Sequence, residues 1–229
     1  MNPETSSHPT AASLDTLRDI RSIMDRSARF ISLSGWSGVW AGVTALVGAL
    51  IAWYWLPESL LRYNSTHWPE ANYTAPFCFC GAAFYKPLLL AIVVFLVALA
   101  GGYYFTRRKA QKDGTKLWSP ASRQLFFALA TPLIAGAVFC LGAMYYGHPI
   151  YVAPACLIFY GLALIAGSRH TLSDIRYLGY CELALGSICL FTPGYGLIFW
   201  AAGFGLLHII YGIIMWRRYD RPASNRDTA

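Results

Sequence analysis

Charge is scarce in this sequence. Asp, Glu, Lys and Arg make up only 13% of the 229 residues, which is about half the share typical of soluble proteins. Hydrophobic residues make up 56%, and many of them form long runs without any charge. An ordinary soluble domain of this length does not need so much apolar surface. The composition therefore excludes that class and indicates an integral membrane protein surrounded by lipid.

The sequence also lacks the motifs of common cofactor and metal sites. It contains no phosphate-binding glycine loop followed by Lys and Ser or Thr, and no H-E-x-x-H zinc motif. A b-type haem between helices needs two histidines, but His208 is the only histidine well inside an apolar run. No late apolar run contains a lysine for a retinal Schiff base. We expect no cofactor, no metal and no catalytic residue.

Neither a cleavable signal peptide nor a nucleic-acid partner is expected. A cleavable signal peptide is disfavoured because the first apolar run begins only near Ile31 and is too long for the apolar core of such a peptide. The net charge of +7 does not indicate a nucleic-acid partner. Its basic residues form short clusters between apolar runs, which is typical of the loops of membrane proteins.

The six cysteines do not indicate a disulfide framework. Four of them lie inside apolar runs, where cysteine commonly acts as a small packing residue; these are Cys140, Cys156, Cys181 and Cys189. Cys78 and Cys80 lie in a long polar loop. A disulfide between them would be strained, so pairing elsewhere, metal binding and packing stay open for this pair.

The first 31 residues divide into two segments. Residues 1–12 are polar and rich in Ser, Thr and Pro, which predicts a disordered tail. Residues 13–31 have the apolar periodicity of an amphipathic helix. Such a helix lies on the cytoplasmic membrane surface or binds a cytoplasmic partner protein, and both alternatives stay open.

Six apolar segments then predict an all-α domain over residues 32–218, with a cytoplasmic tail at 219–229. A helix needs about 20 residues to cross the apolar core of a bilayer. The fifth segment is short and contains Glu182, so it supports a span least well. We predict an outer loop at 57–86 and a basic inner loop at 106–123. The six expected spans are 32–56, 87–105, 124–146, 149–167, 178–191 and 197–216.

The basic residues predict the orientation. Between these segments, sixteen Lys and Arg residues fall on one side of the membrane and only Arg62 and Lys86 on the other. Loops rich in Lys and Arg stay in the cytoplasm. We therefore expect a multi-pass protein of a bacterial inner membrane, with both termini cytoplasmic. In the inner loop, Arg107, Arg108 and Lys109 either contact lipid head groups or serve orientation alone.

We expect the six segments to form three hairpins with a recurring pattern. Two return helices read Ile158-Phe159-Tyr160-Gly161-Leu162 and Ile209-Ile210-Tyr211-Gly212-Ile213. Small residues allow helices to pack closely in lipid, although glycine is also generally enriched in membrane helices. Such faces serve packing within one chain or between copies, so an oligomer is possible. The expected packing residues are Ser34, Gly38, Gly42, Gly136, Gly161, Gly186, Gly203 and Gly212.

Two resemblances concern separate parts of the chain. The stretch Cys181-Glu182-Leu183-Ala184-Leu185-Gly186, followed by Phe191-Thr192-Pro193-Gly194 and Tyr211-Gly212, resembles the HdeD-like acid-resistance membrane proteins. That resemblance implies a stress-related, non-enzymatic membrane protein. The long first outer loop and the amphipathic N-terminal helix depart from that family. The start of the first span, Ser32-Leu33-Ser34-Gly35-Trp36-Ser37-Gly38, is similar to uncharacterised bacterial multi-pass proteins.

Glu182 and His208 form the principal candidate site. An ionisable group inside a membrane helix costs a few kcal/mol and usually faces the interior of the bundle. The two residues are expected at similar depth in adjacent helices. Histidine titrates near neutrality, so the pair fits a proton relay or a pH sensor. A purely structural hydrogen bond is the alternative, as is a Glu182 side chain that reaches the membrane surface.

A serine protease is a minor alternative. Gly35-Trp36-Ser37-Gly38 has the G-x-S-G form, and Ser37 with His208 resembles the rhomboid pair, but the rest of that pattern is missing. We therefore expect a non-enzymatic sensor, scaffold or regulator. The alternative is a small transporter or proton-linked permease that uses Glu182 and His208.

Overall fold

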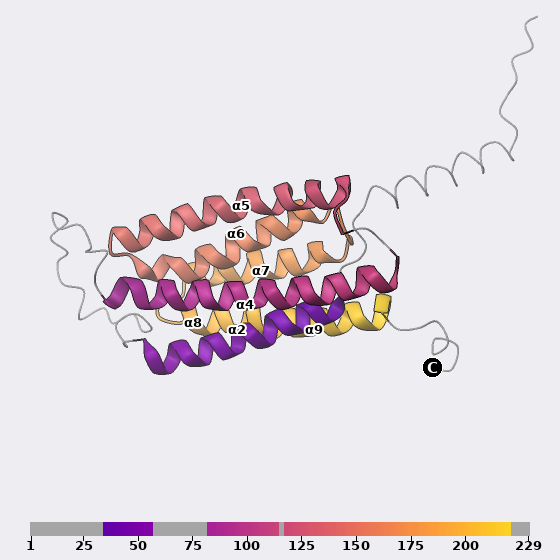
Figure 1. Cartoon of the computed structure of the whole chain (residues 1–229). Helices are drawn as coiled ribbons and strands as arrows, with labels where there is room; N and C mark the ends of the chain where they lie inside the picture. The colour runs from indigo at the N-terminus through magenta and orange to yellow at the C-terminus, as the bar shows by residue number, and fades with distance from the viewer. Residues whose placement is uncertain (1–33, 57–81, 115–116, 221–229) are drawn as a thin grey trace, which may run out of the picture.

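A computed structural model describes residues 34–56, 82–114 and 117–220. The expectations for residues 1–12, 13–31, Cys78 and Cys80, and the tail from 221 lie outside the described residues. Every element of the described part is helical (Figure 1). In chain order these are α2 (Gly35–Trp55), α4 (Ala82–Lys112), α5 (Pro120–Tyr145), η2 (Pro149–Tyr151), α6 (Val152–Gly167), α7 (Ile175–Leu190), α8 (Gly196–Trp200), η3 (Ala201–Leu207), α9 (His208–Met215) and η4 (Trp216–Asp220).

Five helices are long and apolar enough to cross a membrane, judged by length and composition: Gly35–Trp55, Tyr85–Lys112, Pro120–Tyr145, Pro149–Gly167 and Gly196–Asp220. The last of these, here called the final helix, runs from α8 to η4 without a break. The predicted all-α class is confirmed, and the apolar helices fit a multi-pass membrane protein. Helix α7 has only 16 residues, so the count of six spans stays a prediction.

Helix α4 is longer than the span expected at 87–105. It continues to Lys112, so the connection to α5 is shorter than the predicted inner loop at 106–123. Basic residues near a helix C-terminus are favoured by the helix dipole, and Lys109 and Lys112 lie in the last turn. Gly114 follows with a φ of 64°, a conformation that favours glycine and is common just after a helix.

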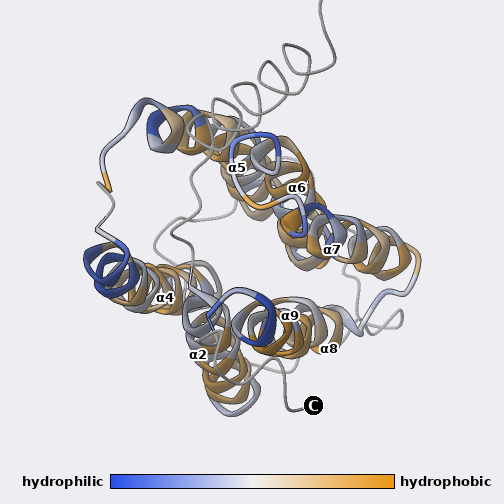
Figure 2. Cartoon of the chain, turned by 90° about the vertical axis from the view of Figure 1, so that its right-hand side faces the viewer, coloured by the Kyte–Doolittle hydropathy of each residue, from blue (hydrophilic) through white to orange (hydrophobic). Residues whose placement is uncertain are grey.

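The helices form two layers that lie side by side. Figure 2 shows α5, α6 and α7 in one layer and α4, α2 and the final helix in the other. Hydrophobic residues cover most of the helix sides, and hydrophilic residues gather at the end that faces the viewer. Within each layer the middle helix packs against both neighbours. Contacts between the layers involve mainly the final helix, which meets α6 and α7.

This packing differs from three closed hairpins. Helix α7 packs chiefly against α6, whereas the final helix packs chiefly against α2. The third expected hairpin is therefore divided between the two layers. Its two arms meet mainly where α7 contacts α8 and η3.

Glycines lie where neighbouring helices of each layer approach each other closely. A Cβ atom on Gly161 of α6 would lie 2.7 Å from the Gly179 carbonyl oxygen of α7. A Cβ atom on Gly212 of the final helix would lie 2.6 Å from the Val39 nitrogen of α2. Such approach is how helices associate in lipid, where burying apolar groups yields little energy. Of the eight expected packing residues, seven glycines are placed where a Cβ would meet another helix, and Ser34 instead hydrogen-bonds to Asp220.

One apolar cluster links the layers near the end of the bundle that holds Asp220. It contains Leu164 of α6, Leu178 of α7 and Met215 of the final helix, all buried. Tyr160 and Tyr211 pack against it. The cluster thus packs the last turns of α6 and of the final helix against the first turns of α7.

The glycine contacts predict unequal effects of two substitutions. In Gly161→Ala the new methyl group overlaps the backbone of α7, and we expect a loss of about 1–3 kcal/mol of stability. Gly142 of α5 has open space around its Cβ position, so Gly142→Ala should leave stability unchanged or slightly raised. The stability of both variants is measured by heating the protein in detergent and recording the fraction that stays monodisperse. Equal behaviour of the two variants would contradict tight packing at Gly161.

Candidate functional site

Glu182, His208 and Tyr160 meet where the two layers touch. Each lies near the middle of its helix: Glu182 in α7, Tyr160 in α6, and His208 at the start of α9 within the final helix. Glu182 is completely buried and His208 nearly so. The structure thus brings together the two residues that the sequence indicates, and adds a tyrosine that it did not indicate.

Both nitrogens of the His208 ring face polar groups. Nε2 lies 2.8 Å from the Tyr160 hydroxyl oxygen. Nδ1 lies 3.0 Å from the Gly203 carbonyl oxygen and 3.3 Å from Oε1 of Glu182. When Nδ1 carries the proton, the ring donates to Gly203 and Tyr160 donates to Nε2. This arrangement satisfies the ring without using Glu182.

Glu182 is close to His208 but is not hydrogen-bonded to it. The 3.3 Å separation is within ion-pair range, yet neither carboxyl oxygen has a hydrogen-bond partner among the described residues. The space for the carboxyl group exists because residue 203 is a glycine. A Cβ there would lie 2.5 Å from Oε2 of Glu182 and 2.5 Å from the side chain of Leu157. Glu182 is therefore a buried polar group without a donor, which is costly in an apolar interior.

The π-helical segment η3 positions this site. It covers Ala201–Leu207 and ends directly before His208. Such segments are rare and occur often at functional sites. Gly203 within it supplies both the acceptor for His208 and the room for Glu182. This π-helical turn is wider than a regular α-helical turn, and it forms the surface of the final helix that faces Glu182 and the ring of His208.

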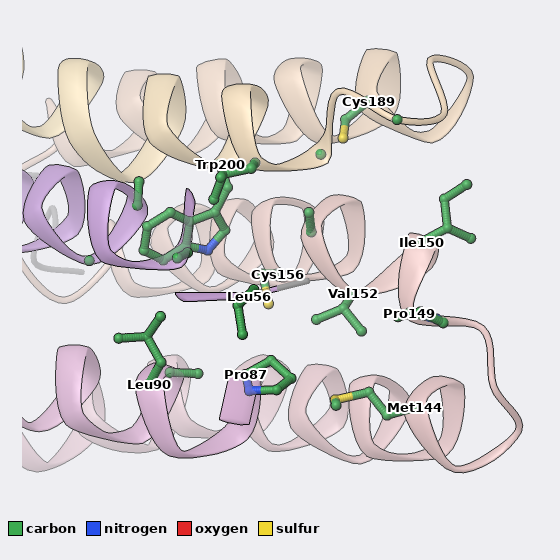
Figure 3. Close-up of a pocket in the computed structure, with 18 of the residues that line it drawn as sticks. Leu56, Pro87, Leu90, Met144, Pro149, Ile150, Val152, Cys156, Cys189 and Trp200 are labelled. Atoms are coloured by element: carbon green, nitrogen blue, oxygen red, sulfur yellow. The ribbon is translucent and has the colours of Figure 1, made fainter. Parts of the chain in front are cut away.

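Aromatic rings extend from the pair toward a cavity at the other end of the bundle. Phe204 stacks on His208 with ring centroids 5.9 Å apart, and Trp200 lies 5.2 Å from Phe204. Trp200 also lines a cavity of about 240 Å³ between the layers (Figure 3). The cavity wall is mostly apolar and includes Cys156, which is also in contact with Cys140 at an S–S separation of 3.8 Å. Cys140, Cys156, Cys181 and Cys189 are all free thiols.

A second polar cluster joins helix ends around Asp220. Its Oδ2 accepts hydrogen bonds from the Gly35 amide at 2.9 Å and the Ser34 hydroxyl at 3.2 Å. Its Oδ1 lies 2.6 Å from Nζ of Lys109. A carboxylate at a helix N-terminus satisfies free amides and is favoured by the helix dipole. The end of the final helix thus caps α2 and holds the end of α4.

Asp174 has a related role beside α7. It accepts hydrogen bonds from Arg218 at 2.9 Å and from the Tyr219 hydroxyl at 3.0 Å. Of the three residues expected near lipid head groups, Lys109 is paired with Asp220, whereas Arg107 and Arg108 are exposed. These two arginines lie free of the cluster that Lys109 joins.

The candidate protease pair is not assembled. Ser37 donates a hydrogen bond to the Ser34 carbonyl, and both ring nitrogens of His208 face other groups. Tyr160 is the member of the candidate site that the sequence did not indicate. Its repeated Tyr-Gly setting, shared with Tyr211, was the available signal.

Comparisons with protein-family models, with curated proteins and with solved structures gave no match. What this site does must therefore be argued from its own geometry.

The two tyrosines of the repeated pattern predict contrasting effects. Tyr160→Phe leaves Nε2 of His208 without a partner, and we expect a loss of about 1–3 kcal/mol of stability. The Tyr211 hydroxyl is buried with no hydrogen-bond partner among the described residues, so Tyr211→Phe should leave stability unchanged or raise it. Thermal unfolding of the two variants beside the unmodified chain provides the measurement. A Tyr211→Phe variant that is less stable than Tyr160→Phe would contradict the described bonding.

Proposed function

We propose that this chain is a non-enzymatic multi-pass protein of a bacterial inner membrane that responds to pH through Glu182 and His208. Six helices cross the membrane in this proposal, with α7 as the short fifth span and both termini in the cytoplasm. The observation that carries it is the buried Glu182 carboxyl group, which has no donor within residues 34–56, 82–114 and 117–220 and lies 3.3 Å from His208.

The net charge of the Glu182–His208 pair depends on the number of protons that it holds. With an ionised Glu182 and a neutral His208 the pair carries one negative charge, and one added proton makes it neutral in either arrangement. An apolar interior strongly favours the neutral state. We infer that the layers stay in contact while the pair holds this proton. Its loss leaves a negative charge beside Leu157 and Gly203, which favours entry of water and separation of the layers.

Few other groups compete for this proton. Helix α7 packs against α6, α8 and η3, and Glu182 lies beside His208 at the start of α9. Apart from His208, the only side chains that titrate in α6, α8, η3 and α9 are Tyr160, Tyr211 and Cys156. None of these is charged near neutral pH. The protonation state of the pair therefore sets the charge of this part of the bundle.

A sensor also needs a route to its partners. In this proposal the amphipathic segment 13–31 and the exposed Arg107 and Arg108 are the cytoplasmic surfaces that transmit the change. The resemblance to HdeD-like proteins supports a stress-related role. A scaffold that binds a partner through 13–31 without any pH response belongs to the same non-enzymatic class.

A proton-linked permease is the second candidate. The cavity between the layers favours it, because Trp200 in the cavity wall connects through Phe204 to His208. A permease would move a small apolar solute through this space with a proton on the pair. Proton flux into liposomes distinguishes the candidates, because only the permease loses a measurable flux in Glu182→Gln.

The sensor proposal predicts a pH response that Glu182→Gln removes. In the unmodified chain, amide hydrogen exchange in α7 and η3 should rise at least about tenfold at alkaline pH beyond the chemical rate, because a negative pair costs more than about 1.4 kcal/mol in this interior. Glu182→Gln keeps the pair neutral and should show a flat profile. Mass-spectrometric hydrogen exchange on the full chain in lipid nanodiscs measures both.

Asp113→Asn is the matched control for that experiment. Asp113 is an exposed acid just beyond α4, and its replacement removes one carboxylate far from the pair. It should keep the response of the unmodified chain. A response that persists in Glu182→Gln would refute the sensor role of the pair.

The six-span topology predicts that both chain ends lie on one side. If α7 crosses the membrane, reporter fusions at the N-terminus and at the C-terminus give the same cytoplasmic signal. If α7 does not cross, five spans remain and the two fusions report opposite sides. Alkaline phosphatase and green fluorescent protein fusions, which are active on opposite sides, make this measurement. Fusions within the 57–81 segment provide the control for the outer side.

A further inference from the structure

The cavity between the layers lies at the end of the bundle opposite Asp220. Its wall comes from the end of α2, the start of α4, the end of α5, the start of α6 and the residues around α8. Figure 3 shows Leu56, Pro87, Met144, Pro149 and Trp200 around this space. Most of these groups are apolar. A mostly apolar space accepts apolar molecules, as a cavity of about 150 Å³ accepts benzene.

Helix α4 leaves one side of the cavity close to the surrounding lipid. It packs chiefly against α2 and exposes Leu89, Ile92 and Val93 on its remaining surface. Ala91, in the same turns, is exposed and also lines the cavity. The hydrocarbon chains of the bilayer are therefore the apolar molecules nearest to this space.

A basic side chain lies beside the cavity. Lys86 directly precedes Pro87 of the wall, and its Nζ lies 5.6 Å from the centre of the Trp55 ring. Trp55 directly precedes Leu56, which is also in the wall. Lys86 is one of only two basic residues that the sequence assigns to this side of the membrane. A cation and an aromatic ring above an apolar space match the order of groups in an anionic lipid.

We propose that the cavity binds one acyl chain of an anionic membrane phospholipid, with the lipid phosphate held by Lys86. The tail fills the space between α2, α4 and α6, and the head group lies at the level of Lys86 and Trp55. This occupant joins the two layers at the end where the described residues leave the cavity. The site goes beyond the proton-responsive pair and does not require it, because Trp200 and Phe204 lie between the cavity and His208.

The test is native mass spectrometry of the full chain, purified in detergent and titrated separately with dioleoyl phosphatidylglycerol and dioleoyl phosphatidylcholine. We expect one tightly bound lipid per chain, with phosphatidylglycerol bound about tenfold more tightly, as one charge-assisted contact provides. Lys86→Gln should lower phosphatidylglycerol affinity to that of phosphatidylcholine. Equal affinities in the unmodified chain, or a preference that survives Lys86→Gln, would overturn the assignment of the head group.

Two alanines of α4 test the tail. Ala91→Phe places a ring in the cavity and should weaken binding of both lipids about tenfold. Ala100→Phe is the matched control, because Ala100 is an exposed alanine of the same helix that does not line the cavity. It should bind like the unmodified chain. Unchanged binding in Ala91→Phe, or a second copy of the chain in place of the lipid, would overturn the proposal.

Glu182→Gln separates this proposal from the function proposed above. The substitution changes the buried pair and leaves the cavity wall intact, so it should keep lipid binding while it removes the pH response. Loss of lipid binding in Glu182→Gln would show that the cavity is not an independent site. A normal pH response together with absent lipid binding would reject the lipid site alone.

Discussion

Backbone contact at glycine is the interaction on which this structure depends. In lipid, apolar side chains gain little by leaving one hydrocarbon surface for another, so helices associate where they approach closely enough for dispersion and polar contacts. Gly161 against Gly179 provides this approach in one layer, and Gly212 against α2 provides it in the other. Most of α4 carries larger residues than glycine, and many of these side chains are exposed on the surface of the bundle. The two layers follow from which helices carry glycine on facing sides.

The contact between the layers is of another kind. It combines an apolar cluster around Leu164 and Met215 with the polar group formed by Tyr160, Glu182 and His208. Glycine provides tight packing within a layer, whereas the contact between the layers includes a buried acid with no hydrogen-bond donor in the part of the chain that the structure describes. The junction between the layers thus places an ionisable pair in the buried interior of the bundle. The cavity continues this same junction toward the Pro149 end.

Much of this architecture could be predicted from the sequence. Apolar runs determine the helices, because hydrocarbon length and backbone bonding leave no other solution. Glu182 and His208 were predicted to meet because rare polar residues at similar depth tend to face each other. Tyr160 was missed, since an aromatic residue in an apolar run looks the same whether it bonds or packs. The pairing of the final helix with α2 rather than α7 was also missed. This pairing depends on glycine contacts between distant parts of the chain, which no local pattern specifies. The capping role of Asp220 is likewise a contact between distant residues and could not be predicted locally.

The Asp220 cap has a consequence for how the protein is made. The carboxylate that satisfies the first amide of α2 belongs to a residue 185 positions later in the chain. The glycine face of α2 likewise receives its partner only when residues near 205 and 212 arrive. Among the described helices α2 is synthesised first, whereas the residues that cap its start and cover its glycine face are synthesised last. The first described helix therefore gains its cap and its glycine-face partner only from the last one.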